Sequence, residues 1–282
     1  MAQHYSPSQT SDFAFCPRYW ALRREGWSGR SAGKKDEAAV FGLGFHAAMT
    51  AWYGRLLASR EVAEPVETAV AAALGTFDQV VVGWQENGVS YDSGKIDELR
   101  VILPKLVQRY IKADPMPKNW SVVAIEQPIP HEGNLRPDLV CLDENGFPVP
   151  VDFKTRLDLA KAEWRAKWID EFATGWQQWH QASAVGARRY VVVPVISAPF
   201  SASWEVYEFQ EPKRALFQET ARRIWTQLEV ARMRICRPWE RPGAVVHSNR
   251  YGDCEFLGAC ARGLDEATLA AEGYVRIERR KP

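Results

Sequence analysis

The sequence predicts an α/β protein with a central mixed β-sheet flanked by helices and a helical insertion in its N-terminal part. Three observations support this fold class. Helical periodicity dominates up to Lys112, short β-branched runs bounded by Pro, Gly and Asn come next, and the rest alternates between helix-like and strand-like segments. A sheet covered by helices accounts for that order of elements. We expect one domain, residues 1–282, because this length lies within the range of a single large domain.

The N-terminal part is predicted to be helical. Ser8 is a candidate cap for a short helix that contains Phe13, Cys16 and Trp20 at helical spacing. Three longer helices come after it, at about 36–59, 65–86 and 94–112. The second opens with a Pro, which suits the first turn of a helix because its missing N–H would have no partner there.

The middle of the chain is predicted to form strands. The run WSVVAIEQPIP reads as a strand that ends in Pro, and LRPDLVCLDENGFPVPVDFKT reads as a hairpin with its turn at 143–146. One long helix is then expected at about 160–185. The runs RRYVVVPVI and SWEVYEFQ should be strands, and a last helix should cover about 213–234.

Composition indicates a cytoplasmic protein. No run approaches the ~18 apolar residues that a membrane span needs, and the opening MAQHYSPSQT lacks the basic and apolar regions of a secretory signal. The formal net charge is only +1, so charge alone does not indicate a nucleic-acid-binding protein. The five Cys are an odd number, which argues against a disulfide framework.

Two acids and a lysine form the strongest candidate site. Asp152 and Lys154 are two residues apart on a predicted strand, so their side chains point to the same face. Asp138 lies on the partner strand, within the ~5 Å that separates cross-strand pairs. Carboxylate oxygens bind hard divalent cations such as Mg2+, and a bound cation activates water and stabilises charge on a phosphate. The lysine is suited to orient the attacking water or to neutralise the phosphoryl oxygens. The simpler alternative is a surface ion pair on an edge strand.

Other polar residues lie near this site in the predicted order of elements. Glu126 ends the preceding strand and is a candidate further acid. Gly42 and His46 are four residues apart on one helix face, where the glycine would permit close approach of another backbone. Gln177 and Gln181 are also one turn apart, so both can face one phosphate or base.

Taken in order, these residues resemble the motifs of the PD-(D/E)xK nuclease superfamily. The resemblance is to its RecB-type branch, which includes helicase-linked exonucleases, phage exonucleases and CRISPR-associated adaptation nucleases. Gly42 and His46 match a helical G-x-x-x-H. Asp138 in LRPDLV matches the acid after the first strand pair, and Asp152 with Lys154 in VDFKT matches (D/E)-x-K.

The fourth motif of this branch, a helical Q-x-x-x-Y, is matched only in part. Gln177 fits its Gln, whereas Gln181 stands where the family has Tyr. This departure affects the expected DNA contact and not the metal site. The resemblance runs from residue 6 to residue 260.

The resemblance implies a restriction-endonuclease-like core and a Mg2+- or Mn2+-dependent deoxyribonuclease. The activity would be that of an exonuclease on DNA ends or single strands, in DNA repair, recombination or phage DNA processing, with a helicase or recombinase as partner. The metal ligands would be His46, Asp138, Asp152 and Glu126, with Lys154 positioning the water. The alternative is a non-catalytic DNA-binding protein or partner subunit that keeps the fold, against which the intact acids and lysine argue.

The cysteines near the two ends also resemble this branch, many members of which hold a [4Fe-4S] cluster between a CPR segment and C-terminal Cys. Cys16 lies in such a segment, and Cys254 and Cys260 have the expected spacing. The fourth ligand would be His247 or Cys236. Four thiolate ligands favour an iron-sulfur cluster, whereas three thiolates with one His also suit zinc. Either metal centre would join residues 1–30 to residues 236–262 in a metal-stapled subregion. The alternative is that these are buried thiols, as expected for Cys141.

Arginine and lysine gather in two stretches of the chain. One is near the N-terminus and the other covers the last helix and the segment after it; the residues are Arg18, Arg23, Arg24, Arg30, Lys34, Lys35, Arg222, Arg223, Arg232, Arg234, Arg237 and Arg241. Because the net charge is close to zero, acids gather elsewhere, mainly on the first long helices. Such segregation of charge suits a phosphate-binding channel, although solvated surface residues explain each cluster equally well.

Overall fold

The computed structural model describes residues 13, 16–24, 27–28, 37–58, 66–86, 89–129, 135–158, 162–173, 176–233, 248–249, 252–253, 266–271 and 275–276. The chain divides into two compact units. One comprises Met1–Lys35 and Gln218–Pro282, and the other comprises Asp36–Phe217. The second unit contains the central sheet.

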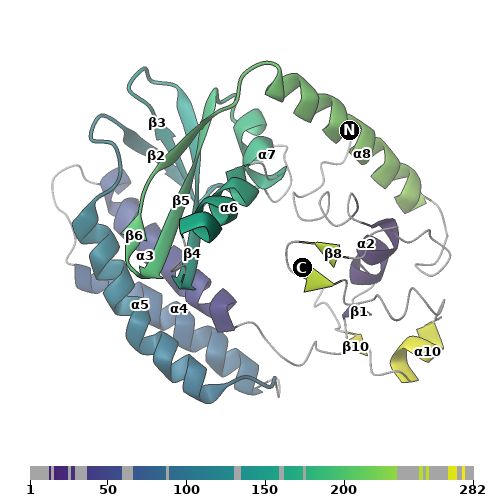
Figure 1. The fold of residues 1–282 in the computed structure, drawn as a ribbon, viewed down its shortest axis with the longest axis horizontal. Helices are drawn as coiled ribbons and strands as arrows, with labels where there is room; N and C mark the ends of the chain where they lie inside the picture. Colours follow the sequence, from purple (N-terminus) through teal and green to yellow (C-terminus); the bar gives the residue numbers. More distant parts are fainter. Residues whose placement is uncertain are drawn as a thin grey trace. The chain divides into compact units, whose positions relative to one another are not determined.

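The central sheet is mixed, as predicted (Figure 1). Its strands have the order β2-β3-β4-β5-β6, and β7 also pairs with β5. They span β2 Ser121–Ile125, β3 Leu139–Leu142, β4 Pro148–Asp158, β5 Arg189–Ala198, β6 Ser201–Ala202 and β7 Glu205–Glu208. The β4–β5 pair is parallel and the other pairs are antiparallel. This mixed sheet with helical layers is consistent with the restriction-endonuclease-like fold.

The hairpin of β3 and β4 turns at the predicted residues. Asp143 accepts hydrogen bonds from the backbone N–H groups of Asn145 and Phe147 through Oδ1, both at 2.9 Å. Gly146 has φ +77°, a conformation that glycine adopts without steric cost. The turn fixes a register in which Leu139 pairs with Val151. Asp138, one residue earlier, therefore lies at the level of Asp152.

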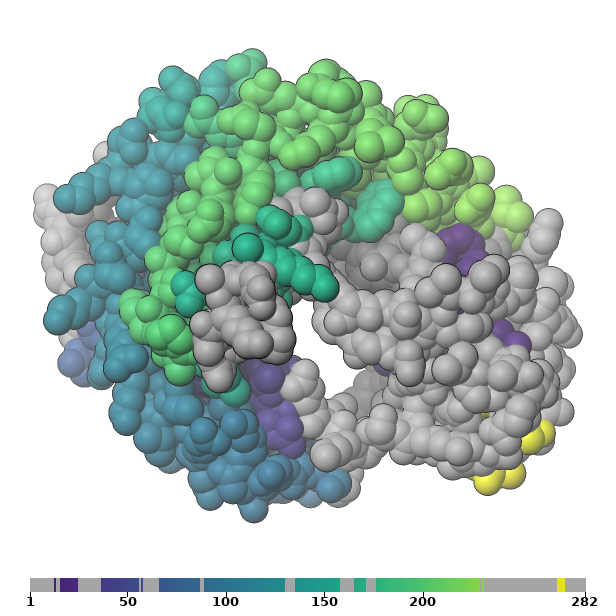
Figure 2. Space-filling view, viewed as in Figure 1, coloured from purple at the N-terminus to yellow at the C-terminus, as the bar shows by residue number. Residues whose placement is uncertain are grey.

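Two helices, α3 Glu37–Ala58 and α5 Ser93–Ala113, pack on one face of the sheet, and α4 Val66–Glu86 packs on these two helices (Figure 1). All three predicted boundaries are within two residues. The aromatic rings of Phe45, Tyr53 and Tyr110 pack around Phe153 of β4. Trp204, in the loop before β7, donates to the Tyr110 hydroxyl at 3.2 Å. The blue α5 and the green residues near 200 accordingly lie side by side in the space-filling view (Figure 2).

The opposite face carries two helices where one was predicted. They are α6 Ala162–Ala173 and α7 Trp176–Ala184, so the prediction of a single helix over 160–185 was wrong. Residues 174 and 175, which lie between them in the sequence, are outside the described residues. Trp168 of α6 packs on Ile196 of β5. The last predicted helix is α8 Lys213–Met233.

The unit formed by the two chain ends contains residues 218–233 of α8. Its other described elements are short: α2 Pro17–Arg24, β1 Trp27–Ser28, β8 Ser248–Asn249, β9 Gly252–Asp253, α10 Glu266–Ala271 and β10 Val275–Arg276. β1 pairs antiparallel with β10, which joins the N-terminal and C-terminal segments. Cys16, just before α2, is buried. Arg18 is also buried, so it does not belong to an exposed basic surface.

By length and composition, α4 alone among the helices described is apolar enough to cross a membrane. Its Ala69, Ala73 and Phe77 are buried in the core with residues of α3 and α5. Core helices of soluble proteins can have the same length and apolar composition, so these two properties are weak evidence for a membrane span.

Candidate metal centre

The helix α3 brings His46 to the sheet. Its buried stripe of Phe41, Phe45, Ala48 and Met49 packs into the core beside β2 and β4. The His46 ring makes an edge-to-face contact with Phe153 of β4. Its Nδ1 lies 3.2 Å from Oδ1 of Asp138.

Asp138 is fixed where β3 begins. Its Oδ2 accepts a 2.6 Å hydrogen bond from the backbone N–H of Phe153, and its carbonyl accepts one from the N–H of Glu126 at 3.1 Å. The carboxylate therefore bridges the strand β4 and the helix α3, while the backbone of the same residue holds the end of β2. Its orientation depends on three elements that are distant in sequence.

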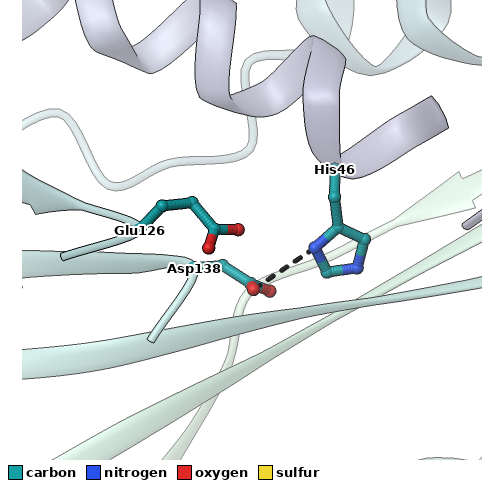
Figure 3. Close-up of side chains that lie close together, drawn as sticks. All are labelled: His46, Glu126 and Asp138. Carbon is teal, nitrogen blue, oxygen red and sulfur yellow. Dashed lines mark ion pairs between the residues drawn. The ribbon is translucent and has the colours of Figure 1, made fainter. Parts of the chain in front are cut away.

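Glu126 comes directly after β2 in an unusual backbone conformation. Its φ is +48°, in the left-handed region that residues other than Gly, Asn and Asp seldom adopt. Such conformations cost of order 1–3 kcal/mol and occur often at functional sites. The side chain of Glu126 points toward Asp138 (Figure 3).

His46, Glu126 and Asp138 form a compact group of candidate ligands. One ligand atom of each lies within 4.8 Å of those of the other two, and the three side chains converge in Figure 3. An imidazole nitrogen and two carboxylate oxygens are suitable donors for Mg2+ or Mn2+. These residues therefore fit a divalent cation, and they include three of the four metal ligands expected from the sequence.

Asp152 lies beside this group but is bonded differently. Its carboxylate is buried, at 1% exposure, and Lys154 Nζ lies 2.5 Å from Oδ2. The two residues share one face of β4, as the strand alternation predicted. Asp152, the fourth expected ligand, is not in the compact group, although its charge interacts with those of Asp138 and His46.

Two adjacent glutamines of α7 hold the Asp152 carboxylate. Gln177 donates to Oδ1 and Gln178 donates to Oδ2, both at 2.8 Å. Gln177 thus contacts the acid, where a phosphate or base contact was expected. Gln181 is buried, so it is not exposed to DNA. Gln178 was not among the residues predicted from the sequence, although the repeated Gln of the WQQW segment is a signal for it.

Burial and mutual repulsion shift the titration of the acids. Desolvation raises the pKa of the Asp152 carboxyl, against the lowering effect of Lys154. Desolvation and the negative charge of Asp138 raise the pKa of Glu126. For His46, desolvation lowers the pKa, but Asp138 outweighs it and leaves the pKa above its usual value. A cation at this site would therefore compete with protons for its ligands.

Of the second expected metal site, the described residues contain only Cys16, a buried free thiol. Cys236, His247, Cys254 and Cys260 lie outside the described residues. Cys141 is part of the hydrophobic core, as predicted, and burial raises the pKa of its thiol to about 12.

A comparison with known protein families identifies the superfamily of this chain. Residues 4–261 match the PD-(D/E)XK nuclease superfamily. The chain belongs to this superfamily. Nucleases of the superfamily use divalent metals, and the group of His46, Glu126 and Asp138 is an acidic site of the kind they need. A comparison of this sequence with curated proteins found no match.

Proposed function

We propose that this nuclease is a Mg2+- or Mn2+-dependent exonuclease that hydrolyses DNA phosphodiester bonds at ends or in single strands. The observation that carries the proposal is the convergence of His46, Glu126 and Asp138 beside the Asp152–Lys154 pair. Ligands for a cation occur here together with a buried acid and a half-buried lysine, on the sheet of a nuclease fold. A surface ion pair would not need Asp152 to be buried and bonded by three side chains.

Each residue has a separate task in this proposal. A cation held by His46, Glu126 and Asp138, with Asp152 as a further ligand, would supply Lewis acidity and an activated water. Lys154 would orient the nucleophilic water and stabilise negative charge on the phosphoryl oxygens. Gln177 and Gln178 would keep the Asp152 carboxylate in place, and thereby orient Lys154.

The test is cleavage of labelled single-stranded and double-stranded DNA by Asp138→Asn, Asp152→Asn and Lys154→Ala proteins, with Mg2+ or Mn2+ and with EDTA. We expect wild-type cleavage that EDTA abolishes, and a loss of at least about 10³-fold in each variant, which corresponds to about 4 kcal/mol of barrier. Circular dichroism and thermal melting show whether each variant remains folded.

Arg100→Gln is a matched control, because Arg100 is bonded to Asp78 between α4 and α5, away from the site. Turnover close to wild type in folded Asp138→Asn or Lys154→Ala protein would contradict the proposal. Metal-independent binding of DNA without any cleavage would instead favour the alternative of a non-catalytic DNA-binding protein or partner subunit that keeps the fold.

The biological setting is also part of the proposal. The motifs support a place in the RecB-type branch, in a cytoplasmic process of DNA repair, recombination or phage DNA processing. A helicase or recombinase would deliver the DNA ends. Reconstitution with and without such a partner, with the length of degraded strand as the readout, tests this assignment.

A further inference from the structure

The strand that carries Asp152 and Lys154 continues in regular pairing beyond them. β4 pairs in parallel with β5 from Val151 to Asp158, and Arg156 is matched with Ile196. Side chains two residues apart on a regular strand share a face. Arg156 therefore comes after Lys154 on the α6 and α7 side of the sheet, at a Cα spacing of about 6.6 Å.

Arg156 presents an exposed guanidinium there. Its Cζ lies 5.8 Å from the ring centroid of Trp168 on α6. Trp168 itself is buried against Ile196, so it is a platform for the arginine and is not available to stack on a base. Within the described part of the chain, Arg156 forms no ion pair or hydrogen bond with a carboxylate.

A second guanidinium lies on the same helix. Arg165 is three residues before Trp168, so both side chains lie on one face of α6. Its Nε is buried and has no hydrogen-bond partner among the described residues. Arg156 and Arg165 thus flank Trp168, on the side of the sheet to which Lys154 points. Neither arginine has a carboxylate partner among the described residues.

We propose that Arg156, supported by Trp168, binds the backbone phosphate of the nucleotide next to the scissile one. A planar guanidinium can hold a phosphate through two parallel N–H bonds, and stacking on an indole reduces the freedom that such binding would cost. The row Asp152, Lys154, Arg156 would then align the DNA strand with the site. This inference rests on the proposed function, because it assigns a subsite to the same substrate.

The experiment is binding of a fluorescein-labelled oligothymidylate strand, measured by anisotropy in EDTA over a range of salt concentrations. Arg156→Gln is expected to weaken binding about fivefold at 0.1 M salt. The slope of log K against log salt should fall by about 0.7, the value for one single-strand phosphate contact. Arg156→Lys should keep most of the slope, because it keeps the charge.

Arg109→Gln is the matched control, an exposed arginine of α5 on the other face of the sheet, and should leave the slope unchanged. A slope in Arg156→Gln equal to that of wild type would overturn the subsite. An altered melting temperature in Arg156→Gln with a wild-type slope also overturns it, since Arg156 would then only support packing. Wild-type protein that neither binds nor cuts DNA would instead refute the proposed function.

Discussion

At the scale of single residues, the main feature is the buried carboxylate of Asp152, whose two oxygens accept hydrogen bonds from neutral amide groups. Asp152 accepts hydrogen bonds from two amides and lies against one ammonium group. The amides add no charge, so they leave the negative charge that would attract a cation in place, and only the positive charges of Lys154 and His46 nearby act against it. A buried acid with fewer donors would remain protonated to higher pH, because burial already raises its pKa.

Gln178→Leu should therefore harm both the fold and the proposed metal site. Loss of the donor leaves Oδ2 of a buried carboxylate with only Lys154, which costs about 1–3 kcal/mol in the free energy of unfolding. We expect a 10- to 100-fold weaker Mn2+ affinity, as for other residues that orient metal ligands. Urea unfolding and isothermal titration with Mn2+ measure the two effects.

Gln181→Leu provides the matched control, because Gln181 is buried on the same helix but makes no hydrogen bond to Asp152 among the described residues. It reports the cost of replacing a buried Gln on α7 by Leu. If both variants lose the same Mn2+ affinity, Gln178 has no special part in orienting Asp152.

At the scale of elements, the placement of His46 depends on how closely α3 approaches its neighbours. The sequence indicated Gly42 as the point of close approach, but a Cβ there would only meet Thr155 Oγ1 at 3.4 Å. Gly44 is the glycine that packing requires. A Cβ on it would lie 2.6 Å from Leu103 Cδ2 and 3.1 Å from the carbonyl oxygen of Ala73.

Gly44→Ala should consequently lower stability, by about 1–3 kcal/mol, because the added methyl group pushes α3 away from α4 and α5. This loss would exceed the gain of up to about 1 kcal/mol that alanine brings to a helix interior. Urea unfolding measures the change. The displacement should also weaken Mn2+ binding, since it moves His46.

Gly75→Ala is the control for helix propensity. Gly75 lies in α4 with nothing within 4 Å of the Cβ position. This variant should gain stability, by about 0.4–1 kcal/mol. A Gly44→Ala protein as stable as Gly75→Ala would show that the α3 contact yields without cost.

At the scale of the whole molecule, the two chain ends belong to one unit. The β1–β10 pair joins residues 27–28 to 275–276, and Cys16 is buried beside α2. We propose that Cys16, Cys254 and Cys260 hold one metal centre with His247 or Cys236. Closing a loop of nearly the whole chain would stabilise this unit, because the centre removes chain entropy from the unfolded state.

Anaerobically purified protein should then contain a [4Fe-4S] cluster, with brown colour and absorbance near ~400 nm, or one zinc per chain. Cys254→Ser should lose the metal and lower the melting temperature. His247→Ala and Cys236→Ala should then differ. The residue whose replacement removes the metal is the fourth ligand, and the residue whose replacement leaves the metal bound is not. Cys141→Ser is the control, since Cys141 lies in the core of the other unit. Protein that contains neither iron nor zinc would leave these residues as ordinary thiols.

The sequence by itself determined the fold class, the three long helices of the larger unit, the hairpin turn and the pairing of Asp152 with Lys154. These features arise from local rules: helical periodicity, turn residues and strand alternation each act within a few positions. The hairpin register even placed Asp138 beside Asp152, because a short turn leaves little freedom between two strands.

Only the tertiary structure decided how side chains from α3, α7 and the end of β2 meet those of the hairpin. Asp138 meets His46 because α3 crosses the sheet beside β4, Glu126 joins them through a left-handed backbone, and Gln178 reaches Asp152 from a separate helix. None of these contacts has a sequence period, since each joins elements that are far apart along the chain. Packing of Gly44 against α4 and α5 sets the position of α3, and hence of His46. Local sequence patterns do not predict this packing, because it depends on residues of two other helices.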